Sequence, residues 1–151
     1  MSIWWSLHLR REAASVPLAR RLLLGAMETA GVDPDVSYDL SVALSEACAN
    51  AVEHGGGPTG GTHCAEYRVT AYLDGEKCRI EVTDSGPGFP SGRRRNPAAQ
   101  GGGHLRESGR GLCLIEQLAD HVHFRNGPGT GAVVSFDKIL KWREGALLQA
   151  S

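Results

Sequence analysis

The fold is decided by residues 41–55, which read SVALSEACANAVEHG. The alanines favour a helix, and Glu46, Asn50 and His54 recur in it at intervals of four. Residues four apart lie on one face of a helix. A carboxylate, a carboxamide and an imidazole in one row suit a hydrated metal ion or a phosphate chain. Three polar residues at this spacing are also typical of a solvated helix face, so this stretch alone leaves both interpretations open.

The flanking patterns predict two more helices and five strands. A first helix is expected from Val16-Pro17 to Gly31, with an apolar face that includes Leu18, Leu22 and Met27. Asp33-Pro34 opens the helix that contains residues 41–55. The third helix begins at Gly111, and its apolar face consists of Leu112, Ile115, Leu118 and Ala119. Alternating apolar residues predict strands at residues 3–9, 67–73, 78–84, 121–126 and 132–137, with Asp74-Gly75 as a hairpin signal between the second and third.

This order of elements predicts an α+β fold, a two-layer α/β sandwich with the helices on one face of a mixed, mostly antiparallel sheet. A chain of 151 residues suits a single domain, residues 1–151. The 16 basic and 17 acidic residues nearly cancel, which argues against direct nucleic-acid binding and against a membrane-surface footprint. No apolar run approaches the ~20 residues that span a bilayer, and the N-terminus lacks a signal pattern. We therefore expect a cytoplasmic protein without a membrane partner.

Neither a disulfide framework nor a zinc site is expected. The four cysteines are scattered without a Cys-x-x-Cys pair, at Cys48, Cys64, Cys78 and Cys113. Such spacing predicts buried free thiols. A zinc site could combine His121 and His123 with His63 and Cys64, which are next to each other in the sequence. The alternation of a strand, however, explains the pair His121 and His123.

Asp84 lies on the same side of its predicted strand as Ile80 and Val82. If that side is the core, an ionised carboxylate there costs several kcal/mol unless donors satisfy it. Asp also opens turns before glycine, so a buried ligand-binding carboxylate and a turn residue both remain open. Gly86 and Gly88 follow, and they allow backbone approaches that other residues prevent.

From residue 91 to residue 111 the periodicity is lost. Residues 93–110 contain five arginines and one acid, Glu107, which gives a net charge of +4. Loops of this length are usually lids, binding loops or disordered segments. The charge of this loop suits an anionic ligand or an acidic partner. Glycines directly before a helix leave backbone donors for phosphate, and Gly109-Arg110-Gly111 has that position.

Three short motifs follow one another in order, namely Glu46-x-x-x-Asn50, Asp84-x-Gly86-x-Gly88 and Gly109-x-Gly111-Leu112. In this order, on a helix, at a strand end and after a long loop, they resemble the Bergerat-fold (GHKL) ATP-binding superfamily. The chain is most similar to its stand-alone branch, the anti-sigma factor serine/threonine kinases. The resemblance covers residues 16–137 and implies an ATP lid at residues 89–110.

The resemblance implies a role for each matched residue. Asn50 would bind Mg²⁺, and Glu46 would be the general base or orient the attacking hydroxyl. Asp84 would accept a hydrogen bond from the adenine amino group. His54 matches the end of this helix in the family, either as a packing or capping residue or as a ligand. The remaining matched residues would contact adenine or the phosphates of ATP: Gly86, Gly88, Gly109, Arg110, Gly111, Leu112 and Thr130.

Three features favour the stand-alone branch over the other members of the superfamily. Sensor histidine kinases usually lack a glutamate equivalent to Glu46. They also carry a helical phosphoacceptor domain before the ATP-binding domain, whereas about forty residues precede residue 41 here. Gyrase-type and chaperone ATPases attach further domains, while this chain ends soon after its last predicted strand.

The resemblance therefore implies an ATP- and Mg²⁺-dependent serine/threonine kinase that phosphorylates a serine of an anti-anti-sigma (STAS-type) protein. Sequestration of a sigma factor is a second implied activity, and homodimerisation through the strand that contains Trp4 and Trp5 is a third expectation. The alternative is an ATP-gated protein-binding module that does not transfer phosphate. Glu46 distinguishes these two functions, because its implied role is needed for phosphoryl transfer and not for ATP binding.

Overall fold

The computed structural model describes residues 2–54, 66–84, 113–126 and 131–144, with only the backbone of His54. These residues form helices and strands close to the predicted positions. A further helical turn covers residues 113–118. The named elements are β1 (Ile3–Arg10), α1 (Ser15–Ala30), α2 (Pro34–His54), β2 (Glu66–Leu73), β3 (Lys77–Asp84), β4 (His121–Asn126) and β5 (Ala132–Ile139).

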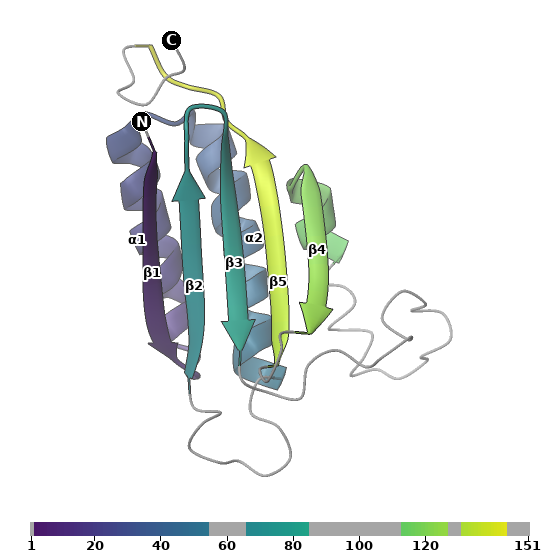
Figure 1. Ribbon diagram of the computed structural model, residues 1–151. Helices are drawn as coiled ribbons and strands as arrows, with labels where there is room; N and C mark the ends of the chain where they lie inside the picture. Colours follow the sequence, from purple (N-terminus) through teal and green to yellow (C-terminus); the bar gives the residue numbers. More distant parts are fainter. Residues whose placement is uncertain (1, 55–65, 85–112, 127–130, 145–151) are drawn as a thin grey trace.

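The strands form one sheet in the order β1-β2-β3-β5-β4. Both long helices cover the same face of this sheet, and β1 and β4 are its two edges (Figure 1). The predicted α+β sandwich is confirmed. Each pairing between described strands is antiparallel, so the parallel component allowed by the expected mixed sheet is not found among them.

Helix α1 contacts the core through a different stripe from the one predicted. Met27 is buried as expected, and so are Ala19 and Leu23, at the positions eight and four residues before it. Leu18 and Leu22 are 46% and 44% exposed. Each lies one residue, about 100° of helical rotation, before a buried position. The predicted stripe was therefore wrong by one residue of phase at these two positions.

The end of α1 was predicted correctly because glycine suits its geometry. Gly31 has a φ of 89°, in the left-handed region, and its N–H donates to the carbonyl oxygens of Met27 and Glu28. This is the usual way in which glycine ends a helix. Asp33 and Pro34 then start α2 directly.

Glycine is less well placed at position 25, in the middle of α1. A Cβ atom added to Gly25 would meet no heavy atom within 4 Å. Because alanine orders a helix at a lower entropy cost, Gly25→Ala is expected to raise the free energy of unfolding by about 0.5–1 kcal/mol. Urea unfolding measures this change. The matched exchange Gly31→Ala should have the opposite sign, because φ at position 31 is positive; a loss of stability in Gly25→Ala would contradict the prediction.

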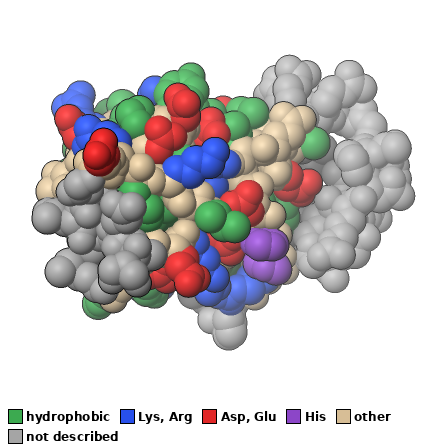
Figure 2. Space-filling model, turned by 90° about the horizontal axis from the view of Figure 1, so that it is seen from above, with side chains coloured by type: hydrophobic (Ala, Val, Ile, Leu, Met, Phe, Trp, Pro, Cys, Tyr) green, Lys and Arg blue, Asp and Glu red, His purple; other side chains and the backbone are tan. Residues whose placement is uncertain are grey.

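The segment after β5 packs across one end of the molecule, which the sequence left undetermined. Asp33 N–H donates to the Lys141 carbonyl at 2.7 Å, and Arg143 N–H donates to the Gly31 carbonyl at 2.7 Å. The Trp142 indole Nε1 donates to the Gly75 carbonyl at 3.1 Å. Residues 140–143 therefore tie the α1–α2 turn to the β2–β3 hairpin. Figure 2 looks onto this end of the molecule, where basic and acidic side chains are interspersed.

Candidate functional site

Helix α2 carries the predicted catalytic and metal-binding residues on the side that is not fully covered. Glu46 and Asn50 are half-buried, whereas Ala47, between them in sequence, is buried against the sheet. Asp39 is seven residues before Glu46 and therefore on the same side of the helix. Its carboxylate lies 3.7 Å from Nζ of Lys138 on β5. The stripe with Glu46 and Asn50 thus faces the β5 side of the molecule.

Asp84, the predicted adenine-binding residue, is a buried carboxylate at the end of β3. Its side chain is on the helix-covered face, and the residue is 7% exposed. Its Oδ1 accepts a hydrogen bond from Ala132 N–H at 3.1 Å, and its carbonyl accepts one from Gly131 N–H at 3.0 Å. The backbone at the start of β5 thus supplies part of the compensation that a buried carboxylate requires.

The fold brings these residues to one end of the sheet. The C-terminal half of α2, the end of β3 and the start of β5 all lie at the end opposite the β2–β3 hairpin (Figure 1). Glu46, Asn50 and Asp84 belong to these segments. The other predicted ATP contacts lie outside the described residues, and so does the predicted lid at 89–110: Gly86, Gly88, Gly109, Arg110, Gly111, Leu112 and Thr130.

Lys138 is a residue of this region that sequence reasoning missed. It pairs with buried Cys78 on β3 and therefore points to the helix side of the sheet. Its ammonium group donates to the Leu118 carbonyl at 2.9 Å and lies beside Asp39. Lys138 thus links β5, α2 and the last turn of residues 113–118. The signal was available: Val134 and Phe136 alternate toward the core, and a lysine follows at the next core-facing position.

A second missed feature is a buried hydroxyl beneath α2. Tyr67 of β2 is 2% exposed, and its Oη lies 2.5 Å from Oγ of Ser15 at the start of α1. The same hydroxyl is hydrogen-bonded to Cys48 of α2. Burial raises the pKa of the Cys48 thiol to about 12, so the thiol stays protonated near neutral pH. This is a structural cysteine, unlike a reactive one with a lowered pKa.

The cysteine prediction holds for two of the three described residues. Cys48 and Cys78 are free and buried, but Cys113 is exposed. The reason is its place on residues 113–118, where Ile115 and Leu118 supply the face that packs on the core. Cys64 lies outside the described residues.

The histidine pair belongs to a strand, as the alternation predicted. His121 and His123 are both exposed on β4, and His121 Nδ1 lies 2.9 Å from Oδ1 of Asp137. Within residues 2–54, 66–84, 113–126 and 131–144, no group of three or more His, Cys, Asp and Glu side chains could hold a metal ion.

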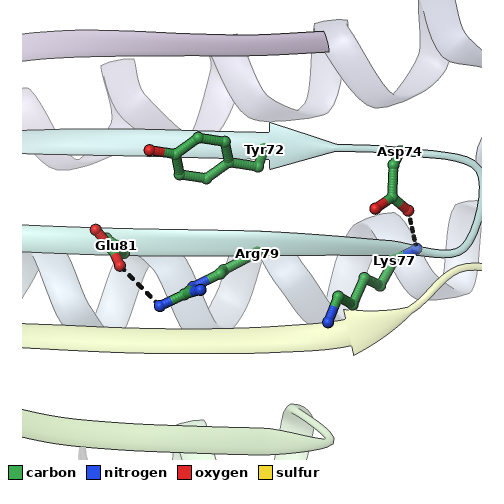
Figure 3. Close-up of a pocket in the computed structure, with 5 residues that line it drawn as sticks. All are labelled: Tyr72, Asp74, Lys77, Arg79 and Glu81. Carbon is green, nitrogen blue, oxygen red and sulfur yellow. Dashed lines mark hydrogen bonds and ion pairs between the residues drawn. The ribbon is translucent and has the colours of Figure 1, made fainter. Parts of the chain in front are cut away.

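A separate cavity of about 270 Å³ lies on the sheet face away from the helices, and Figure 3 shows the five residues that line it. Asp74 accepts hydrogen bonds from its own hairpin, at 2.7 and 2.8 Å from the backbone nitrogens of Glu76 and Lys77. These bonds hold the pKa of Asp74 below its usual value. Arg79 pairs with Glu81 at 3.0 Å. Four of the five lining residues thus interact with one another or with the hairpin backbone, and the cavity does not include Glu46, Asn50 or Asp84.

The helices of the described part of the chain contain no segment that is both long and apolar enough to cross a membrane.

A family model for the histidine kinase-like ATPase domain matches residues 9–138. The chain belongs to this family. The resemblance seen in the sequence is thereby confirmed. The match runs from the end of β1 to β5 and includes Glu46, Asn50 and Asp84.

Two relatives of this histidine kinase-like ATPase domain have functional names. The chain is 32% identical over 130 residues to serine-protein kinase RsbW of Bacillus licheniformis, which covers 83% of this chain and 78% of the relative. It is 31% identical over 118 residues to the anti-sigma F factor of Pasteuria penetrans, which covers 74% of this chain and 75% of the relative.

Solved structures support the fold of the domain. The RsbU and RsbW domains of a Mycobacterium tuberculosis protein align with a TM-score of 0.63 and 21% identity over 91% of this chain, which spans only 33% of that longer one. The SiaB–SiaC complex of Pseudomonas aeruginosa aligns with a TM-score of 0.60 and 13% identity over 89% of this chain and 88% of that chain. At these identities the likeness concerns the fold alone.

Proposed function

We propose that this chain is an ATP-dependent serine/threonine protein kinase of the anti-sigma factor type, which phosphorylates a serine of an anti-anti-sigma protein. The observation that carries the proposal is the placement of Glu46 and Asn50 on α2 at the same end of the sheet as buried Asp84. This placement occurs within a histidine kinase-like ATPase domain. The names of the two relatives, a serine-protein kinase and an anti-sigma factor, support the choice of substrate class.

In this proposal Asp84 recognises adenine. Its carboxylate is held at the sheet end by Ala132 N–H, which orients it as an acceptor for the exocyclic amino group of the base. Gly86 and Gly88 would let the following loop pass close to the ring, and Thr130 would contribute its hydroxyl, directly or through a water molecule.

The side chain of Asn50 would hold Mg²⁺ together with oxygens of the ATP phosphates. An amide oxygen is a suitable ligand for this hard cation, which commonly uses one or two protein groups and keeps its other positions for phosphate and water. The half-buried position of Asn50 on the stripe facing β5 fits this role. The bound cation would neutralise charge on the phosphates.

Glu46 is the proposed general base. The serine oxygen forms a bond to the γ-phosphorus while the bond between that phosphorus and its bridging oxygen breaks. ADP leaves with the electron pair, and Glu46 accepts the proton of the serine hydroxyl. Glu46 is one helical turn before Asn50 on the same stripe, which would place the base beside the residue that holds the metal ion.

The remaining proposed site residues are at the end of the predicted lid and directly after it in the sequence. Residues 1–151 would form one ATP-binding domain with the lid at residues 89–110. The backbone of Gly109, Gly111 and Leu112 would donate to the phosphates, and the guanidinium of Arg110 would add charge-assisted hydrogen bonds.

The proposed partners are an anti-anti-sigma protein, a sigma factor and a second copy of the chain. For the homodimer we propose the β1 edge, where Ile3 and Trp4 are exposed, because an edge strand presents backbone groups that another chain can pair with. Light scattering should give the mass of a dimer at working concentration, and a monomer would contradict this part of the proposal.

ATP-dependent phosphorylation would take place in the cytoplasm.

The test is a phosphorylation assay with anti-anti-sigma proteins encoded near this chain. Purified protein, Mg²⁺, ATP and each candidate are incubated together. Phosphorylation sites in each candidate are then identified by peptide mass spectrometry. A phosphorylated serine in one candidate is the expected result. The alternative, an ATP-gated binding module, predicts ATP-dependent complex formation without phosphoserine.

A further inference from the structure

The buried hydroxyl of Tyr67 connects β2 with both long helices, α1 and α2. Tyr67 stands directly opposite Asp84 in the pairing of β2 with β3. Side chains of directly opposed residues project from the same face of a sheet, so the ring rises beside the carboxylate toward the helices. There it meets Ser15 of α1 and Cys48 of α2.

The hydrogen bonds of this group have a defined direction. Ser15 Oγ donates its proton to the Glu12 carbonyl at 2.7 Å. A serine hydroxyl has one proton, so Ser15 must accept the hydrogen bond from Tyr67. The oxygen of Tyr67 is then the acceptor for the Cys48 thiol. The resulting chain runs from Cys48 through Tyr67 and Ser15 to the Glu12 backbone.

This row of hydrogen bonds connects segments whose relative position the proposed chemistry depends on. Cys48 is two residues from both Glu46 and Asn50 on α2, and Tyr67 is the cross-strand neighbour of Asp84. Cys48, Tyr67 and Ser15 are all buried. Buried hydrogen bonds of this kind restrict neighbouring elements to one arrangement.

We propose that Tyr67 is a positioning residue for nucleotide binding: its hydroxyl holds α2, with Glu46 and Asn50, at a fixed distance from Asp84. This inference rests on the proposed function, since it assumes that adenine and phosphates are bound at these two places. ATP would then span a distance that the Tyr67 chain sets in advance.

The test compares Tyr67→Phe with Tyr72→Phe. Both changes remove one hydroxyl from β2, but Tyr72 is 45% exposed on the opposite face of the sheet, stacked on Trp4 at 6.3 Å between ring centroids. The dissociation constant of Mg-ADP is measured by calorimetry well below the unfolding temperature of each variant. We expect an increase of roughly tenfold for Tyr67→Phe, the lower end of what the loss of an outer-shell hydrogen bond costs at metal sites, and no change for Tyr72→Phe.

Hydrogen exchange of the α2 amides provides the second measurement. Faster exchange around Cys48 in Tyr67→Phe, together with weaker ADP binding, supports the positioning role. Wild-type affinity for ADP in folded Tyr67→Phe would overturn it, whatever the change in thermal stability. If Tyr67→Phe does not fold, Cys48→Ala removes one bond of the chain and leaves Tyr67 and Ser15 in place; wild-type ADP affinity in that variant would also overturn the inference. Failure of the wild-type chain to bind ADP would refute the proposed function itself, and the inference with it.

Discussion

Glu46→Ala is expected to lower the rate of phosphoryl transfer by about 100- to 10,000-fold, the usual contribution of a general base. Nucleotide binding should change little, because Asp84 and Asn50 are left in place. Glu46 is half-buried on α2, and its neighbour Ala47 supplies the packing against the sheet, so truncation at position 46 should not unfold the helix. Single-turnover phosphorylation of the partner measures the rate, and calorimetry with ADP measures binding.

The control for Glu46→Ala is Glu28→Ala. Glu28 is an exposed acidic residue in the last turn of α1, far in sequence from the proposed site, and its removal should leave the transfer rate unchanged. A Glu46→Ala variant that still phosphorylates its partner at the wild-type rate would exclude Glu46 as the base.

Asp84→Asn should have the second large effect, on binding instead of chemistry. The amide oxygen of asparagine can still accept from Ala132 N–H, but its nitrogen is a donor and would face the adenine amino group, which is also a donor. We expect the dissociation constant for ATP to rise by about 100-fold, or about 3 kcal/mol. Guanine carries an acceptor at the equivalent position, so the preference for ATP over GTP should fall as well.

Calorimetry with ATP and GTP on the same variant distinguishes this effect from misfolding. A misfolded site would lose both nucleotides, whereas the predicted change penalises ATP more. Asp74→Asn is the matched control, because Asp74 lies in the hairpin at the other end of β3 and its hydrogen bonds are to local backbone amides. Unchanged ATP affinity in Asp84→Asn would show that Asp84 does not contact adenine.

The elements that could be predicted are those whose signals are local. Gly31 ends α1 because only glycine adopts its backbone angles at low cost. Alternation along residues 67–73 and 78–84 is sufficient to place β2 and β3, since a strand with one buried face must alternate. Asp84 was marked by the same alternation, as a charge on the apolar side of a strand.

The features that escaped prediction depend on contacts between distant parts of the chain. Tyr67 and Ser15 are 52 residues apart, and Lys138 meets Leu118 across 20 residues. The alternation along β5 places Lys138 on the core-facing side, but nothing in either segment identifies the distant partner of Tyr67 or of Lys138. The prediction that Leu18 and Leu22 face the core was wrong for another reason. A helix with apolar residues on adjacent stripes does not specify which stripe faces the sheet.

The central claim, transfer of phosphate from ATP to a protein serine, is tested most directly with labelled nucleotide. Wild-type protein, Mg²⁺ and the cognate anti-anti-sigma protein are incubated with ATP labelled either at the γ-phosphate or at the α-phosphate, and the partner is recovered after denaturation. The proposed function predicts label on a partner serine from the γ-position, none from the α-position, and labelling at least about 100-fold slower with Glu46→Ala. A bound cognate partner that remains unlabelled from γ-labelled ATP would contradict the kinase assignment and favour an ATP-gated binding module.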